Sequence, residues 1–67
     1  MSDSTDTLVR MANQIARNLA HDHDPVGATL NHIRDFWDPR MKERIVSVLD
    51  LPLDPVAAAA VERLRQG

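Results

Sequence analysis

Three Asp-Pro pairs divide this 67-residue chain into segments of helical length: Asp24-Pro25, Asp38-Pro39 and Asp54-Pro55. Aspartate is a favoured N-cap because its carboxylate accepts the unpaired N–H groups of a first helical turn. Proline suits the first helical position, where no N–H donor is needed, and it moves the residue before it out of the α region. Each pair therefore predicts that one helix has ended and that the next begins at the proline.

Between these pairs, apolar residues recur at helical spacing. The periodicity predicts helices at about residues 6–20, 25–37, 39–49 and 55–66, after a disordered N-terminus over residues 1–5. No segment alternates with the two-residue period of a strand. The sequence thus predicts an all-α fold, a compact bundle of three to four short helices, in a single domain over residues 6–66.

The same spacing predicts which side chains form the core. They are Leu8, Met11, Ala12, Ile15, Ala16 and Leu19 in the first helix, Val26, Leu30, Ile33 and Trp37 in the second, Met41, Ile45, Val48 and Leu49 in the third, and Val56, Ala57, Ala60, Val61 and Leu64 in the fourth. Phe36, the only phenylalanine, lies to one side of the apolar stripe of its helix together with His32. We therefore expect Trp37 in the core and Phe36 toward a partner.

The chain is short for an independent domain. A chain of about 60 residues buries only about 60% of its unfolded surface, and this one has no cysteine with which to form a disulfide. Small scaffolds without such cross-links often depend on oligomers or partners. We expect this protein to work inside a complex.

Charge and hydropathy exclude two classes of partner. The net charge of −2 and the pI of about 5.8 argue against a dedicated binder of nucleic acid or of membrane surfaces. The acidic, polar N-terminus lacks the basic and then apolar order of a signal peptide. The longest apolar run, Val56 to Val61, is far shorter than the ~20 residues that cross a bilayer. We expect a cytoplasmic protein with no nucleic-acid partner and no membrane partner.

One loop resembles a metal site in composition. His21-Asp22-His23-Asp24 offers two imidazoles and two carboxylates, which are zinc ligands, but no second ligand cluster completes the set and Asp24 is assigned as a cap. We expect a solvated loop and no metal site, with a small metal-dependent protein as a competing hypothesis. The chain also has no cysteine, no serine in a nucleophile setting and only two glycines. We therefore expect no catalytic and no cofactor-binding residue.

Two segments resemble the delta subunit of NAD-dependent formate dehydrogenases: Leu8–Ala16, which reads LVRMANQIA, and His32–Met41, which reads HIRDFWDPRM. The resemblance covers roughly Leu8 to Leu64, and it is weakest at residues 21–24 and 51–54. It implies a small accessory subunit without catalytic residues that assists the assembly or stability of a large catalytic subunit. It also implies that other subunits carry a molybdenum or tungsten pterin cofactor, iron–sulfur clusters and FMN, and that the complex oxidises formate and reduces NAD.

The positions that match these motifs predict a partner-binding set. Several of its members are polar or lie off the predicted core stripe. The set is Arg10, Asn13, Gln14, His32, Phe36, Trp37, Arg40 and Met41. A simpler interpretation of the polar side of the first helix is that it faces water, as most polar helix faces do. A free-standing helical adaptor or regulator with an unrelated partner is the alternative function.

Overall fold

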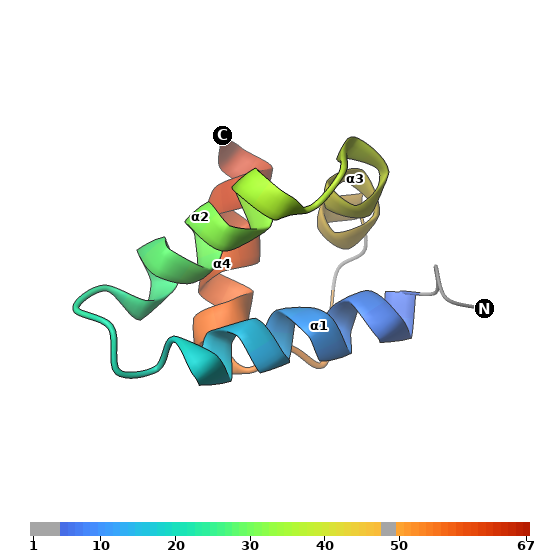
Figure 1. The fold of residues 1–67 in the computed structure, drawn as a ribbon. Helices are drawn as coiled ribbons and strands as arrows, with labels where there is room; N and C mark the ends of the chain where they lie inside the picture. The colour runs from blue at the N-terminus through green and yellow to red at the C-terminus, as the bar shows by residue number, and fades with distance from the viewer. Residues whose placement is uncertain (1–4, 48–49) are drawn as a thin grey trace.

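The computed structural model describes residues 5–47 and 50–67, and these residues form four helices and no strand. The helices are α1 (Thr5–Asn18), α2 (Pro25–Phe36), α3 (Pro39–Ser47) and α4 (Pro55–Gln66). In Figure 1, α2 and α3 lie on the same side of α1, and α4 runs behind α1 and α2 and crosses both. The predicted all-α fold is confirmed.

The helix starts follow the Asp-Pro pairs, because α2, α3 and α4 each begin at the proline. Both bounds of α1 and the end of α2 differ from the prediction by one or two residues, and α4 ends at Gln66 as predicted. α1 includes Thr5, which was assigned to the disordered N-terminus, and it ends at Asn18. α2 ends at Phe36 and leaves Trp37 as its C-cap residue. Residues 1–4 and 48–49 lie outside the described residues. The predicted core positions Val48 and Leu49 and the predicted end of the third helix fall on them.

Two of the three aspartates cap their helices as predicted. Asp24 Oδ1 accepts a hydrogen bond from the Gly27 N–H at 3.1 Å, and Asp38 Oδ1 accepts one from the Met41 N–H at 2.9 Å. Each bond satisfies an N–H group that has no partner inside the helix. The Asp24 carboxylate also explains Gly27, because a Cβ at that position would lie 2.2 Å from Asp24 Oδ2.

The third predicted side-chain cap is wrong. Asp54 makes no side-chain bond to the first turn of α4, and its Oδ2 lies 4.0 Å from Arg17 Nη2 instead. The backbone of Asp54 still takes the N-cap role, since its carbonyl accepts the Ala58 N–H at 2.7 Å. The Asp54 carboxylate thus lies toward Arg17 of α1 and not toward the first turn of the helix that it was expected to cap.

The core lies where the four helices meet. Its buried members are Leu8, Val9, Ala12 and Ala16 of α1, Ile33 of α2, Trp37, Ile45 of α3, and Ala57 and Val61 of α4. Met11 is an error in the prediction, because 38% of its surface is exposed. Successive helical residues are turned by about 100°, and the other helices pack on the side of α1 that carries Val9, which leaves Met11 at the rim.

Close approach of α2 and α4 depends on small side chains. These two helices make the most extensive contact in the fold, and Ala57 and Ala60 of α4 are completely buried. Thr29 of α2 is also completely buried, and its hydroxyl has no hydrogen-bond partner among the described residues. An unpaired buried hydroxyl costs free energy, so tight packing is achieved here at some loss of stability.

Two cations position α3. Lys42 Nζ donates to the Arg34 carbonyl near the end of α2 at 3.3 Å, and Arg65 Nε of α4 donates to the Val46 carbonyl near the end of α3 at 2.9 Å. The last carbonyls of a helix have no partner within it, and positive side chains also suit the negative helix C-terminus. These bonds join α3 to α2 and to α4 and help to set the direction in which its outer face points.

The caps give a direct test. Replacing Asp38 with Ala removes the bond to the Met41 N–H and should lower the free energy of unfolding by about 1 kcal/mol, measured by urea or thermal unfolding. Asp54→Ala is the matched control, since it removes the same side chain from the same kind of Asp-Pro junction but no cap bond. The pair with Arg17 that it also removes is exposed and should contribute little. Its cost should be clearly smaller, and equal costs for the two variants would contradict this account of the caps.

Candidate protein-docking surface

The most exposed large apolar side chain in the described structure is Phe36, with 73% of its surface accessible. It ends α2, and its neighbour Trp37 is only 5% exposed. Trp37 has extended backbone angles, φ −82° and ψ 141°, so the chain leaves the helix between these two residues. The indole therefore enters the core while the Phe36 ring stays outside, as the sequence predicted for both.

His32 lies one helical turn before Phe36 and contacts it. The two ring centroids are 4.7 Å apart, and the ring planes are tilted by 38°. Residues four apart lie on the same side of a helix, so the pair forms one aromatic patch on α2. His32 is half-buried, which leaves Phe36 as the part of the patch that another protein could reach.

The other predicted residues of this corner divide between inside and outside. Arg40 is exposed, in the first turn of α3. Met41 is half-buried and packs against the core. We use the term corner surface for the exposed Phe36 and Arg40 together with the half-buried His32, and regard Trp37 and Met41 as its support from within.

The predicted residues of α1 lie elsewhere. Arg10 and Gln14 are exposed, and about 100° per residue places them on the side of α1 opposite Ala12 and its buried neighbours. Gln14 Nε2 donates to Asn18 Oδ1 at 3.0 Å along that same side. Because α2 and α3 pack against the buried side, the structure does not bring Arg10 and Gln14 together with the corner surface.

Asn13 has a role within the chain that its sequence position did not reveal. Its Nδ2 donates to the Pro52 carbonyl at 3.2 Å, and its Oδ1 accepts the Asp54 N–H at 2.8 Å. One side-chain amide thus bonds to the backbone at two positions, Pro52 and Asp54, in the connection that leads into α4. The partners lie 39 and 41 residues away along the chain, so no local pattern could have indicated them.

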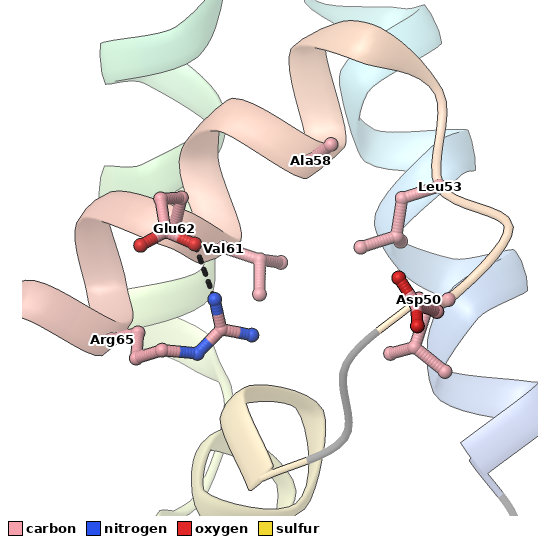
Figure 2. Close-up of a pocket in the computed structure, with 7 residues that line it drawn as sticks. Asp50, Leu53, Ala58, Val61, Glu62 and Arg65 are labelled. Atoms are coloured by element: carbon pink, nitrogen blue, oxygen red, sulfur yellow. Dashed lines mark hydrogen bonds and ion pairs between the residues drawn. The ribbon is translucent and has the colours of Figure 1, made fainter.

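Pockets are also present on the surface of the described residues. The first, of about 310 Å³, lies between the connection before α4 and α4 itself (Figure 2). Leu53, Ala58 and Val61 contribute apolar surface, while Asp50 lies on one side and the Glu62–Arg65 ion pair on the other. The second, of about 330 Å³, lies between the start of α1 and α3, and the third, of about 280 Å³, between the end of α1 and the start of α4.

The His21–Asp24 loop is exposed, and its carboxylates bond to backbone. Asp22 Oδ1 accepts the Asp24 N–H at 3.0 Å, and Asp24 Oδ1 caps α2. The described residues contain no group of three His, Cys, Asp or Glu that could hold a metal ion. Iron–sulfur clusters are bound mainly by cysteine thiolates, and the chain has none, so its residues do not fit such a cluster. Among the described helices, none is long and apolar enough to cross a membrane.

Fold and surface together define a small helical domain whose accessible features suit contact with another protein. The comparison with protein families identifies the family of this chain. Residues 7–61 match the family described as the NADH-dependent formate dehydrogenase delta subunit, FdsD, and the chain belongs to this family. Searches of curated proteins and of solved structures found no match.

The role of Asn13 can be tested apart from any partner. Asn13→Ala removes two hydrogen bonds to backbone, one of them to a partly buried N–H group, and should lower the free energy of unfolding by about 1–3 kcal/mol. Gln14→Ala is the matched control, because it removes an exposed amide from the next position and should cost little. Hydrogen exchange at the Asp54 amide should accelerate in the first variant alone. Unchanged exchange there would show that the bond contributes nothing to the connection.

Proposed function

We propose that this chain is a non-catalytic accessory subunit of a molybdenum- or tungsten-dependent, NAD-reducing formate dehydrogenase in the cytoplasm, and that it assists the assembly or stability of the large catalytic subunit. The observation that carries the proposal is the family match over residues 7–61. The lack of cysteine supports a role outside the cofactor chemistry. The metal–pterin cofactor, the iron–sulfur clusters and FMN then belong to the other subunits.

The corner surface is the proposed contact with the catalytic subunit. Burying a phenylalanine side chain contributes about 1.5–3 kcal/mol, and Phe36 leaves most of that contribution unused in the isolated chain because 73% of its surface is exposed. Arginine and aromatic residues are also enriched among the side chains that dominate binding energy, and Arg40 lies four residues away. Arg10 and Gln14 form a separate polar surface on α1, which remains a proposed second contact, and Asn13 supports the fold near it.

Removing the exposed ring should weaken retention of the subunit. Phe36→Ala should cost about 2 kcal/mol of binding free energy, which raises the Kd for the complex about thirtyfold. Met11→Ala is the matched control, since among the described residues Met11 is the second exposed large apolar side chain, and it lies on α1. Phe36→Ala should unfold near the wild-type temperature, and Met11→Ala somewhat below it, because more of the Met11 side chain is buried. Equal retention of the two variants would remove the corner surface from the proposal.

The assembly role predicts a particular pattern of activity. A complex produced without this chain should contain less metal–pterin cofactor, while formate-dependent NAD reduction divided by bound molybdenum or tungsten should stay nearly unchanged. The measurement is that normalised rate, with and without the subunit. A large fall in the normalised rate at full cofactor loading would mean that the chain takes part in catalysis or electron transfer. Co-purification of the native chain with an unrelated protein alone would favour the adaptor alternative.

A further inference from the structure

Two arginines on α3 have no ionic partner within the described structure. Arg40 and Arg44 are exposed, and their spacing of four residues places them on one side of the helix. The ion pairs among the described residues are Arg17–Asp54 and Arg65–Glu62. Arg40 and Arg44 therefore present two guanidinium groups, one turn apart, to whatever lies outside.

The electrostatics of the isolated fold do not favour this arrangement. Like charges four residues apart on a helix repel each other, and Arg40 is in the first turn of α3, close to the positive end of the helix dipole. α3 carries Arg40, Lys42 and Arg44 against one carboxylate, Glu43, in a chain whose net charge is −2. Unlike Lys42, which bonds to the end of α2, the two arginines make no side-chain hydrogen bond or ion pair with the residues that the structure describes.

The same arginines line a hollow in the surface. The pocket of about 330 Å³ between α3 and the start of α1 is bordered by Arg40, Arg44, Glu43, Ser47 and Thr5. The Ser47 hydroxyl donates to the Glu43 carbonyl within α3, so it is already engaged. The positively charged groups in the hollow are the two guanidinium groups, whose planar, forked donors match carboxylates in pairs of hydrogen bonds.

We infer that the outer face of α3 receives an acidic segment of the catalytic subunit, with carboxylates of that segment paired to Arg40 and Arg44. The inference rests on the proposed function and gives the contact its chemistry: Phe36 supplies apolar contact at the corner, and the arginines supply ionic contact along α3. Glu43 in the same hollow repels a continuous polyanion such as nucleic acid. Separate carboxylates can each be placed beside one guanidinium group and away from Glu43.

The test measures binding of the purified full-length chain to the complex prepared without it. Arg44→Gln should raise the Kd by about tenfold or more and should make the Kd less sensitive to salt, because an ion pair at the contact is lost. Arg63→Gln is the matched control: it is an exposed arginine on α4 with the same change in charge and without an ion pair among the described residues. Its Kd should stay within about twofold of the wild type.

Three outcomes would overturn the inference. Equal weakening by Arg44→Gln and Arg63→Gln would mean that net charge alone steers association. Unchanged binding of Arg44→Gln while Phe36→Ala binds weakly would leave the proposed function intact and remove the arginines from the contact. A lower unfolding temperature for isolated Arg44→Gln would mean that the arginine serves the fold. If the wild-type chain itself fails to bind the complex, the proposed function fails as well, so the two failures are distinguishable.

A chemical probe identifies the partner group. Carbodiimide couples amines to carboxylates, and Arg44→Lys places an amine where the guanidinium group was. The complex that contains this variant should give a cross-link from position 44 to an aspartate or glutamate of the catalytic subunit, located by mass spectrometry. The wild-type complex gives no cross-link at that position because arginine is not coupled. Absence of the cross-link from the variant complex would count against carboxylate recognition.

Discussion

The fold depends on how the chain turns between α2 and α3. The Trp37 N–H donates to the Ile33 carbonyl at 3.0 Å and ends α2, and the Asp38 carboxylate accepts the Met41 N–H and begins α3. Two consecutive residues thus close one helix and cap the next, and the connection between α2 and α3 is correspondingly short. The Trp37 side chain then fills the core beneath that turn. With the turn fixed, Phe36 can only remain outside, and the outer face of α3 is held in one direction.

The parts of the fold that sequence could predict are those decided by neighbours along the chain. A proline determines where a helix begins, and an aspartate before it can reach the first turn without help from elsewhere, so all three starts were predictable. Asp54 shows the limit of this reasoning. Its carboxylate could interact either with the first turn of α4 or with Arg17 of α1. Which of the two it contacts depends on how α1 and α4 pack, and the sequence near Asp54 does not contain that information. Met11 was misplaced for a related reason, since helical period alone could not establish which side of a broad apolar face the other helices would cover.

The candidate surface follows the same division. Phe36 and Trp37 could be separated from sequence because one lies on the apolar stripe of its helix and the other beside it. Asn13 could not be understood in that way, because both of its backbone partners lie in a connection about forty residues further along the chain. Polar residues on a helix look alike in sequence whether they face water, a partner or a distant segment of the same chain. The separation of Arg10 and Gln14 from the corner surface likewise needed the position of α1 relative to α2 and α3.

The close contact between α2 and α4 has an evolutionary consequence. Ala57 and Ala60 of α4 are completely buried, and a larger side chain at either position would have to displace its neighbours, so selection for folding leaves these positions little freedom. Phe36, Arg40 and Arg44 touch so little of the interior that they can change while the domain still folds. A few substitutions at these exposed positions can therefore alter what this small protein recognises. The protein can co-evolve with a changing partner while every variant along the way still folds.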